Sequence, residues 1–261
     1  MDFILQYFFD FGLMGDEFGR VLEGFWQTIK LSILAGVLSL IWGLILAVLR
    51  QLPGRGLAPV RGLVIAYIDV FRGIPLLLVL LFVSSSLSAF AGEDLIPRFI
   101  GQPTWLGQTT AFWYGILALT LTYGAYMAEV YRAGIESVPG GQTEAARSLG
   151  MSHGQAMRHV IVPQAVRKVI PPLLNDLLAL MKDTSLVSIL GLVEVVKAGS
   201  DVQSEFFNNS AFVLGALMFL VVTIPLARVI DLLIAREQSR TNRGASGESG
   251  ATPRQTGIAG A

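Results

Sequence analysis

No cysteine occurs in the 261 residues, which excludes disulfide bonds, cysteine metal sites and thiol catalysis. Charge is scarce as well: 15% of the residues are charged and 53% are hydrophobic, whereas about 25% of residues are charged in soluble domains. The formal net charge is zero, so bulk charge provides no attraction for nucleic acid. These deficits predict an all-α polytopic protein of the lipid membrane with no nucleic-acid partner.

Catalytic motifs are missing too. The sequence holds no GxxxxGK[ST] phosphate loop and no HExxH. Its only two histidines, His153 and His159, lie in one short stretch without acidic or cysteine partners, so we expect surface residues and no metal site. We therefore expect no enzyme activity and no cofactor in this chain. A membrane-embedded enzyme is the weakest functional class, because no nucleophile, base or metal constellation is visible.

Long apolar runs are what the sequence does contain. About 20 residues at 1.5 Å each cross a hydrocarbon core of about 30 Å, and five runs are long enough. They cover residues 24–49, 63–90, 110–135, 166–196 and 211–235. We expect each run to be one transmembrane helix.

Three other segments complete the expected organisation. Residues 1–23 are acidic and rich in Phe and Leu, and we expect an interfacial segment. Residues 24–235 form the transmembrane domain, which includes a polar connecting loop at 136–165, called here the polar insert. Residues 236–261 are rich in Gly, Ser, Thr and Ala, and we expect a disordered tail.

Basic residues are distributed unevenly between the runs. With the N-terminus outside, twelve Lys and Arg fall in the cytoplasmic segments 50–61, 132–168 and 236–261. Three remain outside, namely Arg20, Arg98 and Lys197. Cytoplasmic loops carry the excess of basic residues, so this asymmetry predicts an outside N-terminus, a cytoplasmic C-terminus and a cytoplasmic polar insert.

The polar insert carries local signals for two short helices. Residues 142–149 are good helix formers, and Gly150 follows them at the position where helices commonly end in a left-handed glycine. Ser152 and Gln155 have the spacing of a capping box, which opens a second helix running to Pro163. We therefore expect two helices separated by a glycine.

Small and apolar residues break the polar pattern of this insert: Ala145, Ala146, Leu149 and Met151. The simpler interpretation is a surface linker, because short amphipathic helices between spans are common. A solvated linker would be polar at these positions, however, and such a face favours docking into a groove of another protein.

The insert resembles the EAA loop of ABC importer permeases. Glu144, Ala145 and Ala146, then Gly150, then Val160, Val162 and Pro163 match the pattern EAA-x3-G-x9-I-x-L-P, with Val in place of Ile and of Leu. The flanking stretches YGAYMAEVYRAGIESVPGG and VPQAVRKVIPPLLNDLLALMKDTSLVS, and FRGIPLL at 71–77, are similar to the polar amino acid subfamily. The resemblance extends from about residue 24 to residue 231.

This resemblance implies a fold of the type I, MetI-like importer kind and a set of partners. It implies cytoplasmic ATPase subunits, which bind ATP and Mg, and a second permease subunit, identical or paralogous. It also implies an extracellular or periplasmic solute-binding protein and a location in the cytoplasmic membrane of a prokaryote. The insert, through Glu144, Ala145, Ala146, Leu149, Gly150 and Met151, would dock into the ATPase.

Charged residues within the runs are the candidate substrate site. An ionisable residue in the bilayer costs about 2.5–3.5 kcal/mol on insertion scales, so it normally faces a cavity. Arg72 lies about 14 Å into its run, near the midplane. The candidate ligands for a zwitterionic amino acid are Arg72, Glu129, Lys182, Asp183, Thr184 and Ser185. The two cations among them, Arg72 and Lys182, mildly favour glutamate, aspartate or glutamine over cationic amino acids.

Structural roles are open for several of these residues. Asp69 and Arg72 are three residues apart and have the spacing of an ion pair. Glu129 lies near the cytoplasmic end and has the position of a gate or salt-bridge residue. The prolines Pro75, Pro171 and Pro172 either expose backbone groups to substrate or kink their helices. A secondary transporter or channel that is driven by an ion gradient and uses the same charges is the alternative function.

Overall fold

The computed structural model describes residues 2–52 and 54–248, and every regular element in those ranges is a helix. The longer helices are α3 (Phe18–Arg50), α4 (Ala58–Gly73), α5 (Leu76–Gly92), α7 (Thr110–Glu136), α10 (Val162–Asp183), α11 (Val195–Phe206) and α12 (Ser210–Glu248). The short ones are α1 (Asp2–Phe8), α2 (Phe11–Asp16), α6 (Arg98–Gly101), α8 (Gly140–Ser148) and α9 (His153–Ala156). The all-α prediction is confirmed for the described ranges.

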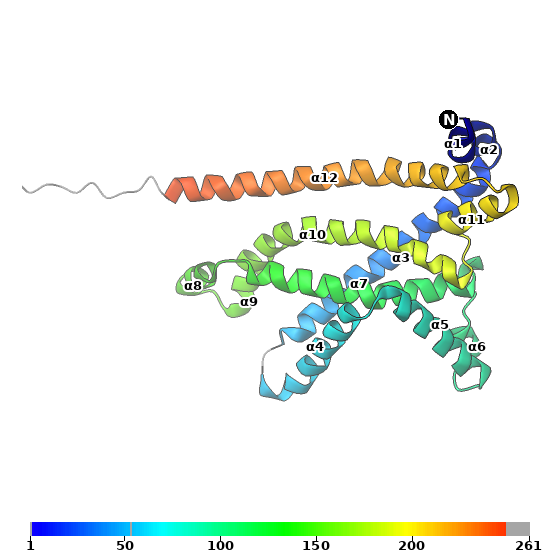
Figure 1. Ribbon diagram of the computed structural model, residues 1–261. Coiled ribbons are helices and arrows are strands. Elements are labelled where there is room, and N and C mark those ends of the chain that lie inside the picture. The colour runs from blue at the N-terminus through cyan, green and yellow to red at the C-terminus, as the bar shows by residue number, and fades with distance from the viewer. Residues whose placement is uncertain (1, 53, 249–261) are drawn as a thin grey trace, which may run out of the picture.

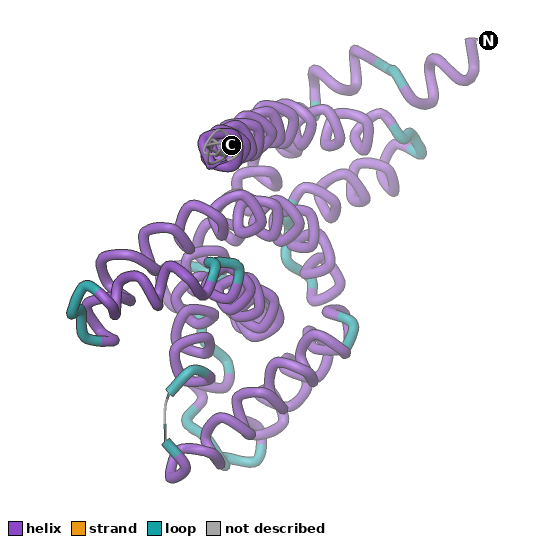
Figure 2. Tube along the Cα trace, turned by 90° about the vertical axis from the view of Figure 1, so that its left-hand side faces the viewer, coloured by secondary structure: helices purple, strands orange, loops and turns teal. Residues whose placement is uncertain are grey.

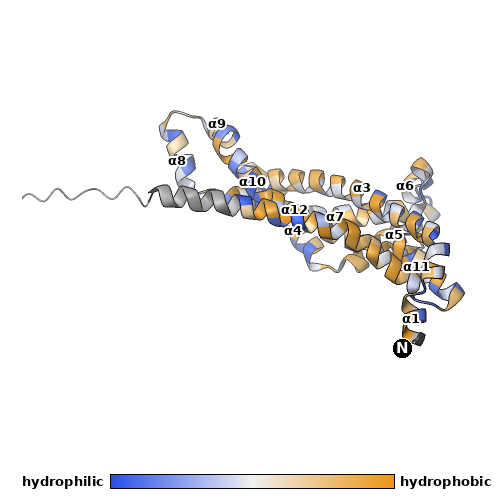
Figure 3. Ribbon diagram, turned by 90° about the horizontal axis from the view of Figure 1, so that it is seen from above, coloured by the Kyte–Doolittle hydropathy of each residue, from blue (hydrophilic) through white to orange (hydrophobic). Residues whose placement is uncertain are grey.

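The long helices form one elongated bundle (Figure 1). At one end lie α8, α9 and the C-terminal end of α12, and at the other end lie α1, α2, α6 and α11. Figure 2 looks along the axis of α12 from the first of these ends. The hydrophobic residues follow α3, α5 and α7, whereas hydrophilic residues gather on α8 and α9 (Figure 3).

Helices α3 and α7 cross at the centre of the bundle through small residues. A Cβ atom on Gly43 of α3 would lie 2.8 Å from Met127 Cβ and 2.9 Å from the Gly124 carbonyl oxygen of α7. Only glycine therefore permits this approach, as is common where helices pack without a hydrophobic driving force between them in lipid. Leu31, Leu80 and Leu119, all fully buried, extend the core around the two helices.

The predicted second span, 63–90, is wrong as a single helix. It is divided into α4 and α5, whose axes differ in direction by 109°. Ile74 between them is extended, with φ −94° and ψ 133°, because the ring of the following Pro75 disfavours a helical residue before it. The backbone around residues 73–75 is thereby turned toward the centre of the bundle.

The predicted fourth span, 166–196, also has different bounds. Helix α10 starts four residues earlier and ends at Asp183, because a 3-10 turn (Thr184–Leu190) follows it and Gly191 then adopts a left-handed φ of +84°. The apolar residues after Gly191 belong to the separate helix α11. Pro171 and Pro172 lie inside α10 and do not end it.

Hydropathy and length together support fewer spans than five. In the described part of the chain, α3 and residues 210–236 of α12 are long and apolar enough to cross a membrane, and the bent pair of α4 and α5 is a third candidate. Tyr, Trp, Thr and Gly dilute the apolar stretch of α7, and five charged residues interrupt α10. The five-span count and its orientation remain predictions.

Both ends of the chain are more helical than we expected. Helix α3 begins at Phe18, so the separate N-terminal segment is shorter than 1–23; it is held to the start of α12, where Asn209 N donates to Tyr7 O at 2.9 Å. Helix α12 continues to Glu248, so the expected disorder of the tail is not observed up to that residue. No proline interrupts α12 after Pro225. The rest of the predicted tail, 249–261, lies outside the described residues.

Candidate functional site

The polar insert folds as two helices around a glycine, as predicted. Helix α8 follows Pro139, and Gly150 adopts a left-handed φ of +83°. Ser152 forms the predicted capping box: its hydroxyl accepts from Gln155 N, and the Gln155 side chain accepts from Ser152 N at 2.8 Å. The second helix does not end at Pro163, because a π-helical turn (Met157–Ile161) leads directly from α9 into α10.

The apolar residues of the insert divide into an inner and an outer group. Ala146 is 4% exposed and faces inward, while the neighbouring core is formed by Val138, Ile161 and Ala165. Leu149 is 81% exposed, and Ala145 is exposed beside it. Leu149 is therefore the main apolar group that the insert presents outward. Glu144 is also exposed and forms no ion pair with Arg147 in the described part of the chain.

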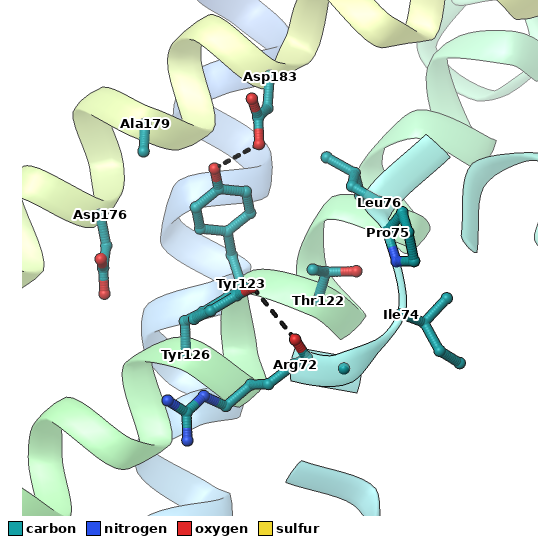
Figure 4. Close-up of a pocket in the computed structure, with 11 residues that line it drawn as sticks. Arg72, Ile74, Pro75, Leu76, Thr122, Tyr123, Tyr126, Asp176, Ala179 and Asp183 are labelled. Atoms are coloured by element: carbon teal, nitrogen blue, oxygen red, sulfur yellow. Dashed lines mark hydrogen bonds between the residues drawn. The ribbon is translucent and has the colours of Figure 1, made fainter. Parts of the chain in front are cut away.

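A second feature is a cavity of about 420 Å³ at the bend between α4 and α5 (Figure 4). Its walls come from the bend itself, from α7 and from α10. The lining residues are Arg72, Gly73, Ile74, Pro75, Leu76, Thr122, Tyr123, Tyr126, Asp176, Ala179 and Asp183. The break at Pro75 thus supplies one wall of the cavity.

Two tyrosines of α7 organise the charged groups of the cavity. Tyr123 OH donates to Asp183 Oδ2 at 2.7 Å. Tyr126 OH donates to the Arg72 carbonyl oxygen at 3.4 Å, and the Arg72 guanidinium lies 5.7 Å from the centroid of the Tyr126 ring, within cation–π range. The three helices are joined across the cavity by these contacts (Figure 4).

Two of the six predicted substrate residues, Arg72 and Asp183, line this cavity together. Lys182 does not, because adjacent residues of a helix point about 100° apart and Asp183 takes the inward position. Thr184 is fully buried and donates to Met181 O at 2.7 Å. Ser185 lies in a different hollow, which it shares with Ser188 and Lys197.

Glu129, the sixth predicted residue, is part of an ion-pair network away from the cavity. Its carboxylate contacts Arg50 of α3 and Arg132, the latter at 2.6 Å. Its side chain is 15% exposed. The structure therefore places Glu129 in a salt bridge between α3 and α7. Asp69 and Arg72 form no ion pair in the described ranges.

Sequence reasoning missed Tyr123, Tyr126 and Asp176 as lining residues. The spacing holds a signal for all three. Tyr123 and Tyr126 are three residues apart, and Asp176 and Asp183 are seven apart, so each pair lies on one face of its helix. Because Asp176 lines the cavity and Lys182 does not, the charged groups of the cavity are one guanidinium and two carboxylates. The excess of cations that favoured acidic substrates is not present there.

Known proteins with a similar sequence are amino acid permeases. The chain is 35% identical over 225 residues to the "Probable glutamine ABC transporter permease protein GlnM" of Bacillus subtilis, covering 86% of this chain and 96% of that one. It is 31% identical over 234 residues to the "Glutamate/aspartate import permease protein GltK" of Escherichia coli O157:H7, covering 88% and 99%.

A solved structure agrees with these relatives. The "Crystal structure of an amino acid ABC transporter with histidines" matches with a TM-score of 0.74 and 30% identity, covering 85% of this chain and 96% of that chain. The family described as "Binding-protein-dependent transport system inner membrane component" matches residues 39–238, which include the bend, the cavity and the polar insert. The chain belongs to this family of ABC transporter permeases, within its polar amino acid members, and is not itself an enzyme.

Proposed function

We propose that this chain is the permease subunit of an ATP-driven importer that moves a polar amino acid across the cytoplasmic membrane of a prokaryote. The observation that carries the proposal is the polar insert: a short helix, a left-handed glycine and a Leu149 that is 81% exposed at one end of the bundle. An exposed leucine beside a rigid turn is suited to a groove on another protein. The partner is a separate ATPase, which binds ATP and Mg.

The same proposal includes the orientation and the other partners. The N-terminus is outside and the C-terminus is cytoplasmic, with five spans and the polar insert on the cytoplasmic side, as the distribution of basic residues predicts. A second permease subunit, identical or paralogous, completes the pathway. A solute-binding protein delivers the substrate from outside.

The connections of the polar insert support alternating access. Helix α9 passes through the π-helical turn into α10 without a loop, and α10 carries Asp176 and Asp183 in the cavity wall. At the other side of the insert, Lys168 Nζ donates to Ser137 O at 2.7 Å and joins α10 to the end of α7. Closure of the ATPase would move α8 and α9, and α10 would move with them as a rigid body.

The substrate class is polar amino acids, among which the sequence favours glutamate, aspartate and glutamine. One guanidinium and two carboxylates line the cavity, which supports an amide side chain over an acidic one, because a third carboxylate would face like charge. The relatives are named for glutamine and for glutamate and aspartate, so the uptake experiment includes one amide and one acidic substrate.

The test is uptake into proteoliposomes that contain the permease, its ATPase and its binding protein. Labelled L-glutamine, L-glutamate or L-histidine is added on the side of the membrane that carries the binding protein. ATP is supplied on the opposite side, which carries the ATPase. We expect uptake of at least one of them only with ATP and only with the ATPase present. Uptake by the permease alone, driven by a proton or sodium gradient, would instead support the secondary transporter.

A further inference from the structure

We infer that an apolar groove on the side of the bundle binds one acyl chain of a phospholipid of the outer leaflet. The groove has a volume of about 590 Å³ and lies between α3 and α7. Pro103 and Trp105, in the connection from α6 to α7, line one end of it. The inference goes beyond the proposed function and uses the orientation and the second permease subunit that are proposed there.

The groove runs lengthwise along both helices. On α3 it is lined by Leu38, Ile41 and Ile45, whose spacing places them on one face of the helix. On α7 it extends from Trp113 to Leu121, a rise of about 12 Å at about 1.5 Å per residue. The hydrocarbon of one leaflet is about 15 Å deep, which is half of a core of about 30 Å. The groove therefore has nearly the length of an acyl chain in a single leaflet.

The lining is mainly hydrocarbon, because most polar atoms of its aromatic rings are bonded within the protein. Trp42 Nε1 donates to Tyr67 OH at 2.8 Å, and Tyr114 OH donates to Gly101 O at 2.6 Å. In the described part of the chain, Thr120 Oγ1 is the one buried side-chain oxygen of the lining that has no partner. Such a surface does not compensate the desolvation of a polar ligand, whereas an alkyl chain has no polar group to desolvate.

The end of the groove at Trp105 has the features of a membrane–water interface. Helix α6, which precedes it, lies at the end of the bundle that the proposed orientation places outside (Figure 1). The ring centroids of Trp105 and Trp113 are 5.3 Å apart, and tryptophan is enriched at the level of lipid headgroups. Gln102 and Thr104, on either side of Pro103 in the sequence, are exposed. A phospholipid whose chain occupies the groove thus has its headgroup near polar side chains.

The groove and the charged cavity lie on opposite faces of α7. The helix contributes Thr122, Tyr123 and Tyr126 to the cavity, and it lines the groove with residues between 113 and 121. At about 100° per residue, the mean directions of these two sets differ by about 160°. The second permease subunit completes the pathway that includes the cavity, so the groove faces away from that subunit. Its occupant is therefore a lipid.

An exposed apolar surface continues from the groove along α3. Leu44 and Val48, which do not line the groove, are 50% and 54% exposed, and Ile41 in its wall is 52% exposed. Helix α3 is long and apolar enough to cross a membrane. The groove is thus a hollow in a lipid-facing surface, and an empty hollow loses dispersion contacts along its walls. A chain that lies in the hollow gains contacts that a chain on the open surface lacks.

The experiment uses the permease–ATPase complex in proteoliposomes of phosphatidylcholine, with a trace of phosphatidylcholine that carries a diazirine in the middle of one acyl chain. Irradiation attaches this chain to the residues beside it, and mass spectrometry of peptides measures the labelling of residues 113–121. Ile41→Trp places a larger side chain in the groove wall. We expect it to reduce the labelling about fivefold, because the chain loses its contacts in the groove.

The matched control is Leu44→Trp. Leu44 lies on the same helix with nearly the same exposure as Ile41 but does not line the groove, so the variant should leave the labelling unchanged. Unchanged labelling in Ile41→Trp, or an equal loss in Leu44→Trp, would overturn the inference.

The position of the diazirine along the chain tests the leaflet. A diazirine near the carboxyl end should label Trp105 and Trp113 more than Leu121, and one near the methyl end should label Leu121 more. This order follows from a headgroup at the Trp105 end of the groove. The opposite order would assign the groove to a chain of the inner leaflet and overturn the inference.

A second cross-link separates lipid from protein as the occupant. The chain has no native cysteine, so Ile41→Cys carries a benzophenone maleimide at that position alone. We expect irradiation to give adducts with phosphatidylcholine. A cross-linked permease pair that Leu44→Cys does not give would assign the groove to the second subunit and overturn the inference. Wild-type proteoliposomes that show the expected labelling but no ATP-driven uptake with the binding protein added would instead overturn the proposed function.

Discussion

The Gly150→Ala variant tests whether the observed shape of the polar insert is needed for docking. Gly150 has a φ of +83°, and a Cβ atom placed on it would meet no atom within 4 Å. The added methyl group therefore clashes with nothing, and its whole cost is the left-handed backbone conformation. That conformation costs a residue with a Cβ atom about 1–2 kcal/mol.

If the unbound variant insert relaxes to another backbone conformation and the ATPase binds only the one described, this cost is incurred on docking and weakens the affinity. A shift of about 1–2 kcal/mol is a factor of about 5–30 in an equilibrium constant, so the Kd for the ATPase should rise by that factor. Gly154 is the matched control, because it lies in α9 without a left-handed φ and also has open space around it. Gly154→Ala should leave the Kd unchanged or lower it, since Ala favours a helix over Gly by about 0.5–1 kcal/mol.

The assay titrates purified ATPase onto detergent-solubilised permease and records ATP hydrolysis in parallel. Gly150→Asn provides a rescue, because Asn tolerates the left-handed region better than Ala does. We expect the Kd to increase in the order Gly154→Ala, Gly150→Asn, Gly150→Ala. Equal Kd values for Gly150→Ala and Gly154→Ala would refute the idea that the turn at Gly150 sets the docking conformation.

Two further predictions concern stability and are checked by thermal unfolding in detergent. Gly43→Ala should destabilise the chain by about 1–3 kcal/mol, because the added Cβ would lie 2.9 Å from the Gly124 carbonyl oxygen. Gly19→Ala is the control, since a Cβ at this position of the same helix meets open space. Equal Tm values for the two variants would show that the crossing of α3 and α7 adapts freely. Glu129→Gln should lower the Tm, because it removes the anion between Arg50 and Arg132. The free energy of unfolding should fall by at most about 3 kcal/mol, since the ion pairs are still partly exposed. A changed KM for substrate with an unaltered Tm would instead assign Glu129 to the substrate site.

Local features were the predictable part of this protein. The left-handed Gly150 and the capping box of Ser152 and Gln155 depend on neighbours within three residues, so the sequence alone identified both correctly. The family resemblance rested on the same short stretch, on the segments that flank it and on FRGIPLL at 71–77. The all-α class followed from composition, because apolar runs of this length have few alternatives.

Tertiary packing decided what could not be predicted. Arg72, Lys182 and Asp183 are all charged residues in apolar runs, yet only the rotation of α10 in the bundle determines that Asp183 and not Lys182 faces the cavity. Glu129 was chosen for the same reason, and its partner Arg50 is 79 residues away in sequence. The 109° bend at Pro75 turned one expected span into two helices, and a proline alone does not specify such an angle.

The measurement that tests the central claim most directly is the accessibility of Leu149→Cys. The chain has no native cysteine, so a single introduced thiol reports only its own position. We expect a water-soluble maleimide to label it from the cytoplasmic side, and bound ATPase to slow the labelling at least about tenfold, since an 81% exposed side chain would become buried. Gly56→Cys, in the exposed connection before α4, should be labelled equally with and without ATPase. Labelling of Leu149→Cys from the outside, or at the same rate with the ATPase bound, would contradict coupling through the polar insert.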